Sequence, residues 1–171
     1  MATETSTRVR WAGAAAAALA CALILAGTFL PWWSGGGDGL RMGIGLREVD
    51  LCSGDTCRST GLEDLGQSTR AWLLCGATGF GLGWVAALFL AGAAVVAAAA
   101  ARRPDAGGAW PGRVARAAAG LSLFALVVGV GFAGTYPGFS GLSLAAGVFL
   151  YLGGAALGVG SAGVLLARAP A

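Results

Sequence analysis

Two of the four cysteines stand close together in a polar segment, and their spacing suits disulfide chemistry. Cys52 and Cys57 enclose a Ser, a Gly, an Asp and a Thr, residue types that favour a turn. A hairpin loop of about four residues brings the Cα atoms that flank it within the roughly 4.4–6.8 Å that a disulfide tolerates. We therefore predict a Cys52–Cys57 disulfide that fixes a small sheet.

The other two cysteines, Cys21 and Cys75, lie in long apolar stretches. We interpret both as buried thiols at contacts between helices, since an uncharged cysteine packs as a small apolar side chain. The enzymatic alternative is a four-span membrane thiol–disulfide oxidoreductase, which usually needs a Cys-x-x-Cys exchange pair and further cysteines that relay to a quinone. Here the pair is Cys-x4-Cys with only Cys75 near the same side, so we expect no enzyme.

Carboxylates gather between residues 34 and 70, where six of the eight acids lie: Asp38, Glu48, Asp50, Asp55, Glu63 and Asp64. Their spacing matches no calcium loop and four Arg are interspersed, so we interpret them as a solvated surface. The chain has no His, and we find no phosphate-binding glycine loop or nucleophile motif. We expect no metal, no cofactor and no catalytic residue.

The elements that carry these residues are set by four long apolar stretches. A membrane-spanning helix needs about 20 apolar residues, and the stretches predict such helices at about residues 11–33, 71–101, 115–136 and 142–167. Hydrophobic residues make up 57% of the chain and charged residues 11%, whereas a soluble domain carries about a quarter charged residues. We predict an all-α membrane protein, a four-transmembrane-helix bundle. It is a single domain over residues 1–171, with one sizeable loop at residues 34–70.

The arginines indicate the orientation. Seven Arg lie in the N-terminal tail, the connection between the second and third spans and the C-terminal stub, against four on the opposite side. The positive-inside rule then places both termini in the cytoplasm and the loop outside, where disulfides persist. We expect a multi-pass protein of a bacterial cell (inner) membrane. The net charge of +3 is a topology signal, so we expect no nucleic-acid partner.

A cleaved signal peptide is the alternative for the first span, but no small-residue cleavage site follows Leu30. Six of the eight Trp and Tyr residues lie near the ends of the spans, and we interpret them as interfacial anchors: Trp11 and Trp110 on the inner side, Trp32, Trp33, Trp72 and Tyr136 on the outer side.

The loop predicts short strands. Residues 34–39 are glycine-rich, and we interpret them as a flexible exit from the membrane. Apolar residues then alternate with small or polar ones, as in a half-buried strand, at Leu40, Met42, Ile44 and Leu46. The phase slips before Val49 and Leu51, as a β-bulge or bend would cause. Residues 61–66 predict a short helical turn that leads into the second span.

These features resemble the claudin superfamily, a group of four-span proteins that includes the claudins and the peripheral-myelin-protein-like proteins. Its first-loop signature is a Trp, then Gly-Leu-Trp, then two disulfide-bonded cysteines. The matching residues here are Trp32 or Trp33, Gly45-Leu46, and Cys52 with Cys57. Arg47 replaces the second Trp, and the second outer loop, residues 137–141, is short. The resemblance implies a small extracytoplasmic antiparallel β-sheet, which we expect to come from the first loop alone.

Small residues recur at helix-contact spacing, at Gly79 and Gly83 in the second span and at Gly154 and Gly158 in the fourth. We interpret them as packing within the bundle; association with other membrane proteins, or of the chain with itself, is the open alternative. We expect a non-catalytic, claudin-like scaffold or accessory subunit that acts through protein–protein contacts in the lipid bilayer and through its loop. An oligomeric channel or small transporter is the alternative function, although no ionisable side chain lies inside a span to line a pathway.

Overall fold

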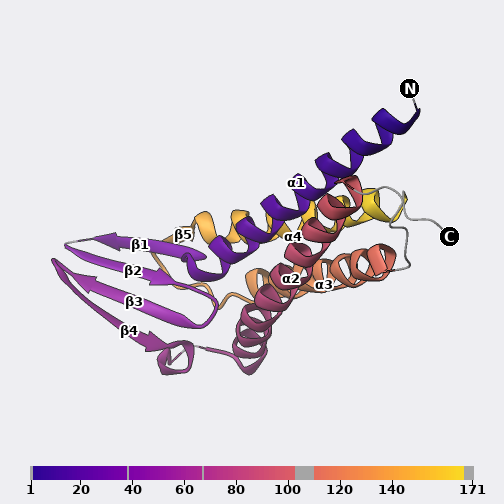
Figure 1. Ribbon diagram of the computed structural model, residues 1–171. Helices are drawn as coiled ribbons and strands as arrows, with labels where there is room; N and C mark the ends of the chain where they lie inside the picture. The colour runs from indigo at the N-terminus through magenta and orange to yellow at the C-terminus, as the bar shows by residue number, and fades with distance from the viewer. Residues whose placement is uncertain (1, 38, 67, 103–109, 168–171) are drawn as a thin grey trace.

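Four long helices make up most of the chain in a computed structural model that describes residues 2–37, 39–66, 68–102 and 110–167, the side chains of 2–6, 110 and 111 excepted. They are α1 (Ala2–Phe29), α2 (Arg70–Arg102), α3 (Trp110–Gly134) and α4 (Ala146–Leu166). Each contains a stretch long and apolar enough to cross a membrane. The prediction of four such helices is therefore confirmed, and Figure 1 shows them packed along one another with a sheet at one end.

Three helix ends nearest the sheet differ from those expected. α1 ends at Phe29 rather than at residue 33, since Pro31 disfavours helical backbone at the residue before it. α3 ends at Gly134, two residues early. α4 begins at Ala146 rather than at residue 142, because residues 142–144 pair with a strand instead. Hydropathy does not separate the end of an apolar helix from an apolar strand that adjoins it.

The helices form a closed ring, in which α1 and α3 each pack against both α2 and α4. Glycine makes the closest approaches possible, as a Cβ built on Gly27 of α1 would lie only 2.4 Å from the backbone nitrogen of Tyr151 in α4. The phenol of Tyr151 is buried and donates a hydrogen bond to the carbonyl of Gly79 in α2 at 2.7 Å. One side chain of α4 thus reaches across the bundle to a third helix.

A five-stranded antiparallel sheet stands at one end of the bundle. The strands β1 (Trp33–Gly37), β2 (Leu40–Ile44), β3 (Glu48–Ser53) and β4 (Thr56–Gly61) follow α1, and the short 3-10 helix η1 (Leu62–Asp64) precedes α2. The fifth strand, β5 (Leu142–Leu144), comes from the connection between α3 and α4 and pairs with β1. The strand order is β4-β3-β2-β1-β5. The predicted small antiparallel sheet after the first helix is confirmed.

Two local expectations about the sheet are wrong, and a third is met in one of its two forms. Residues 34–37 form most of β1 instead of a flexible exit, because backbone pairing needs no side chain. Of the bulge or bend expected before Val49, the structure has the bend, at residues 46–47 of a hairpin turn in which the N–H of Gly45 donates to the carbonyl of Glu48 at 2.9 Å. The sheet also draws on the second loop, since Leu142–Leu144 forms its edge strand.

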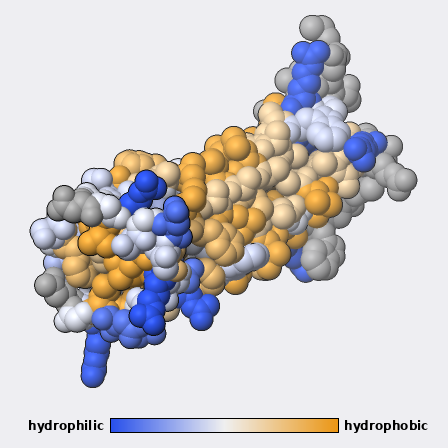
Figure 2. All heavy atoms as spheres, turned by 90° about the vertical axis from the view of Figure 1, so that its left-hand side faces the viewer, coloured by the Kyte–Doolittle hydropathy of each residue, from blue (hydrophilic) through white to orange (hydrophobic). Residues whose placement is uncertain are grey.

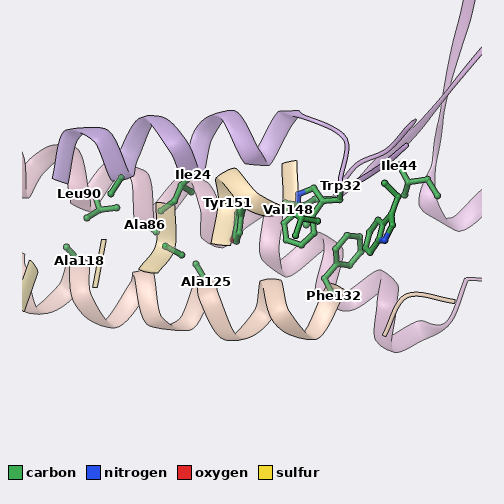
Figure 3. Packing of buried hydrophobic residues seen from close by; sticks show 14 of the residues in the cluster. Ile24, Trp32, Ile44, Ala86, Leu90, Ala118, Ala125, Phe132, Val148 and Tyr151 are labelled. Carbon is green, nitrogen blue, oxygen red and sulfur yellow. The ribbon is translucent and has the colours of Figure 1, made fainter. Parts of the chain in front are cut away.

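Backbone hydrogen bonds tie the sheet to the bundle. The N–H of Trp32 donates to the carbonyl of Ile44 in β2 at 2.7 Å, and the carbonyl of Trp32 accepts from the N–H of Ala145 at 2.8 Å. The segment that follows α1 is thereby joined both to the sheet and to the start of α4. The buried side chains are continuous too: in Figure 3 they run from Tyr151 between the helices through Trp32 and Phe132 to Ile44 of the sheet.

Candidate functional site

The sheet has two chemically different faces, because residues paired across strands share a face and successive residues alternate between faces. The register places Met42 opposite Leu51, and Ile44 opposite both Val49 and Trp33. We call this side the apolar face; its large apolar side chains are Trp33, Leu40, Met42, Ile44, Val49, Leu51, Leu142 and Leu144. The other side, the polar face, carries Ser34, Glu48, Asp50, Cys52, Cys57, Ser59 and Ser143.

The apolar face is covered by other parts of the chain only where it adjoins the bundle. Ile44 and Val49 are fully buried there, whereas Leu40 and Leu51 are 58% and 44% exposed. We call Leu40, Met42 and Leu51 the distal patch. Figure 2, which views the molecule from the sheet end, shows hydrophobic surface on the sheet framed by hydrophilic side chains. Contiguous apolar surface with a polar rim is typical of an interaction site.

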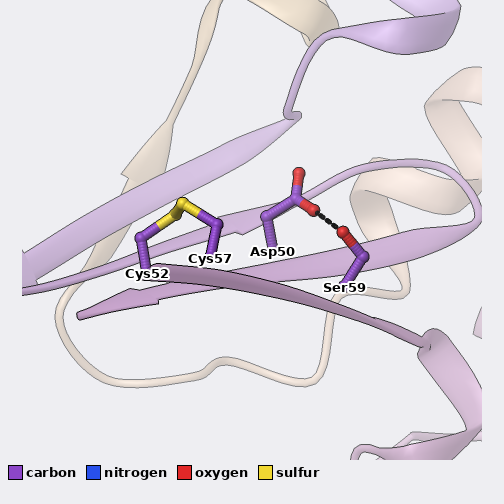
Figure 4. Close-up of a disulfide and its surroundings, with 4 residues drawn as sticks. All are labelled: Asp50, Cys52, Cys57 and Ser59. Carbon is purple, nitrogen blue, oxygen red and sulfur yellow. Dashed lines mark hydrogen bonds between the residues drawn. A yellow bond between two sulfur atoms is a disulfide. The ribbon is translucent and has the colours of Figure 1, made fainter. Parts of the chain in front are cut away.

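The predicted disulfide lies on the polar face. Cys52 of β3 and Cys57 of β4 are direct cross-strand partners with Cα atoms 4.0 Å apart, and their sulfur atoms are bonded. The two-residue turn beyond them begins with Gly54, whose φ of 58° suits glycine. Beside the disulfide, the hydroxyl of Ser59 donates a hydrogen bond to the carboxylate of Asp50 (Figure 4). The predicted Cys52–Cys57 pairing is therefore confirmed, and it holds the outermost hairpin closed.

Aromatic side chains form the joint between sheet and bundle. Trp32 and Trp72 are fully buried and Trp33 is 3% exposed, so their interpretation as interfacial anchors is wrong. Trp33 stacks on Tyr136 with ring centroids 4.3 Å apart, and Trp72 stacks on Phe132 at 5.2 Å. Such contacts between large rigid rings fix the angle of the sheet to the helices. The distal patch is consequently presented in one orientation.

The motif residues Gly45 and Leu46 lie in the turn between β2 and β3, and this turn rests on glycines of α2. Leu46 is buried, and its Cδ2 would lie 3.4 Å from a Cβ built on Gly79. A Cβ on Gly76 would come within 2.4 Å of the carbonyl oxygen of Leu46. Sequence reasoning missed Gly76, although its spacing of three from Gly79 puts both glycines on one helix face.

The other predicted packing glycines also lie at contacts within the chain. A Cβ on Gly83 would lie 2.6 Å from the hydroxyl of Thr28, and one on Gly154 would lie 2.8 Å from the backbone nitrogen of Ile24. A Cβ on Gly158 would likewise lie 2.6 Å from the hydroxyl of a serine in α3. Because these glycines are buried against neighbouring helices, their faces are already occupied.

A second surface feature is a recess of about 530 Å³ where the polar face of the sheet meets α1 and α2. Its walls include Arg47 of the β2–β3 turn, Glu48 at the start of β3, Glu63 of η1, and the aromatic rings of Phe29 and Phe80. The recess therefore joins charged loop residues to the apolar surface of two helices.

The described interior of the bundle offers little reactive chemistry. Besides the phenol of Tyr151, three buried hydroxyl groups are described there, and two of them, those of Thr28 and Ser161, donate to carbonyls of their own helices. Among the described residues, no three of the His, Cys, Asp and Glu type lie close enough to hold a metal ion. Cys21 and Cys75 are both unbonded thiols. The described surface at the sheet end offers two features, the distal patch and the recess.

No family model matches this chain, and no curated protein matches it.

Proposed function

We propose that this chain is a non-catalytic integral protein of the bacterial cell membrane, a claudin-like scaffold or accessory subunit that binds a partner protein through its sheet. The proposal places both termini in the cytoplasm and the sheet outside. Three observations support it: the four apolar helices, the seven Arg on the side of the termini, and a disulfide of the kind that persists in oxidising compartments.

The observation that carries the proposal is the distal patch. Leu40 and Leu51 lie on the same face of adjacent strands and remain exposed, although each Å² of apolar surface left in water costs about 25 cal/mol. Figure 1 shows the strands projecting beyond the end of the bundle, so lipid around the helices does not cover this face. A partner protein with an apolar surface outside the membrane is the occupant that we propose.

A positive charge beside the distal patch indicates what kind of partner would bind there. Arg58 of β4 is the cross-strand partner of Leu51 and is exposed on the same face. β4 is also an edge strand of the sheet, so its outer backbone groups are placed to accept a further strand. An apolar segment that carries an acidic residue, docked on the patch or along this edge, matches both features.

Site-specific photo-crosslinking in intact cells tests this proposal. A photoreactive amino acid at Leu40, on the apolar face, should give one discrete protein adduct. The same amino acid at Arg41 is the matched control, because Arg41 is exposed and adjacent in β2 but belongs to the opposite face. Replacing Leu51 by Ser should abolish the adduct formed from Leu40. Equal labelling from both positions, or none from either, would contradict a partner on the apolar face.

A further inference from the structure

The recess between the sheet and the α1–α2 face contains charges of both signs that do not pair with each other. Arg47 contributes one positive charge, and Glu48 and Glu63 contribute two negative charges. Within the described part of the chain, none of the three forms an ion pair. The guanidinium of Arg47 instead lies over the ring of Phe80, 5.7 Å from its centroid. This cation–π contact holds the positive charge at the inner end of the recess, next to the helices.

The carboxylate of Glu63 is held at a defined place as well. It folds back over Gly61 so closely that a Cβ on Gly61 would meet its oxygen atoms at less than van der Waals distance. Gly61 ends β4 and also lines the recess. The absence of a side chain at this position thus lets the negative charge lie against the end of β4.

Below the recess, the surface of the helices is aromatic and faces outward. Phe29 at the end of α1 is 62% exposed, and Trp84 of α2 is 41% exposed. The ring of Phe29 contacts those of Phe80 and Trp84 edge to face, with centroids 6.2 and 5.6 Å apart. In a membrane-spanning bundle these rings meet acyl chains at the level where headgroups begin, the depth that aromatic residues favour.

We propose that this recess binds the headgroup of a zwitterionic phospholipid with a primary ammonium group, of which phosphatidylethanolamine is the simplest. The inference rests on the membrane placement proposed above. The phosphate lies against the guanidinium of Arg47, and the ammonium lies between the carboxylates of Glu48 and Glu63. The acyl chains descend over Phe29 and Trp84. A volume of about 530 Å³ falls within the range of small-ligand sites, roughly 300–1,000 Å³.

The charges of the recess distinguish this lipid from others of the same size. With two carboxylates against one guanidinium, the recess repels an anionic headgroup such as that of phosphatidylglycerol. A choline headgroup carries the same charges as ethanolamine, but its methylated nitrogen donates no hydrogen bond to a carboxylate. The expected order of affinity is therefore phosphatidylethanolamine first, then phosphatidylcholine, then phosphatidylglycerol.

Native mass spectrometry of the full chain, purified in a mild detergent, measures this order directly. The protein is mixed with equal amounts of the three lipids with identical acyl chains, and the bound fraction of each is compared. We expect phosphatidylethanolamine to be retained over phosphatidylglycerol by about tenfold, because the two carboxylates bond to its ammonium group and repel an anionic headgroup. Equal retention of the three lipids would refute the proposal.

Two variants separate the roles of the charges. Arg47→Gln should lose most of the bound phosphatidylethanolamine. Glu48→Gln combined with Glu63→Gln should invert the preference toward phosphatidylglycerol, because Arg47 then acts alone. Arg58→Gln is the matched control, since Arg58 is exposed on the sheet but does not line the recess. An unchanged preference in the double variant would overturn the assignment. Because no partner protein enters this assay, its result is independent of the crosslinking result.

Discussion

Substitution of neighbouring glycines in α4 tests how the bundle is held together. Gly154 faces α1, and a Cβ there would lie 2.8 Å from the backbone nitrogen of Ile24, about 0.6 Å short of the 3.4 Å at which ordinary contact begins. Gly153, the preceding residue, has nothing within 4 Å of a Cβ. Both substitutions to Ala change helix propensity equally, so the comparison isolates the cost of separating two helices.

The expected magnitudes follow from these distances. Gly153→Ala should be neutral or stabilising by up to about 1 kcal/mol, the gain in helix propensity. Gly154→Ala should be destabilising by about 1–2 kcal/mol after the same gain, because backbone atoms cannot yield as a side chain does and overpacking costs about 1–3 kcal/mol. Gly83→Ala should lie between them, since its nearest neighbour is the hydroxyl end of Thr28.

The assay is reversible unfolding of the purified protein in mixed micelles with increasing SDS, followed by tryptophan fluorescence. Gly79→Ala adds a further point, since its Cβ would make an ordinary contact at 3.4 Å and should cost little. The free energies of unfolding should fall in the order Gly153→Ala, Gly79→Ala, Gly83→Ala, Gly154→Ala. If Gly154→Ala is tolerated as well as Gly153→Ala, the close α1–α4 contact does not exist as described.

Two further predictions concern the sheet and its joint. The double variant Cys52→Ala, Cys57→Ala should lower the free energy of unfolding by at most about 2 kcal/mol, because the ring that the disulfide closes is short. Non-reducing mass spectrometry of the native chain should show two hydrogens fewer than the reduced chain. An unaltered mass would exclude the bond. In a Tyr151→Phe background, the phenol of Tyr136 should ionise above pH 10, because burial raises its pKa from the usual 10.0. The stability that this neutral phenol contributes is present below pH 10 and is lost as the pH rises through the raised pKa. Absorbance at 295 nm during a pH titration measures the ionisation of the phenol. Ionisation at or below pH 10 would show that Tyr136 is not held against Trp33.

The four apolar helices were predictable because hydropathy over twenty residues is a strong local signal. The Cys52–Cys57 pair was predictable for a similar reason, since the turn that joins the two cysteines lies between them in sequence. The strand of residues 34–37 was not predictable, because three consecutive glycines have no side-chain pattern to read. Pairing with Leu40–Ile44 on one side and Leu142–Leu144 on the other makes this segment a central strand.

The sequence by itself determined which segments are apolar, where the charges lie and which cysteines pair, since these depend on composition and short-range spacing. Tertiary structure alone decided that Trp32, Trp33 and Trp72 are buried in a joint rather than exposed at an interface. It also decided that residues more than a hundred positions apart share one sheet, and that Arg47, Glu63 and Phe80 line one recess. The physical reason is that burial and long-range pairing depend on which surfaces meet, and a side chain's own chemistry does not specify its neighbour.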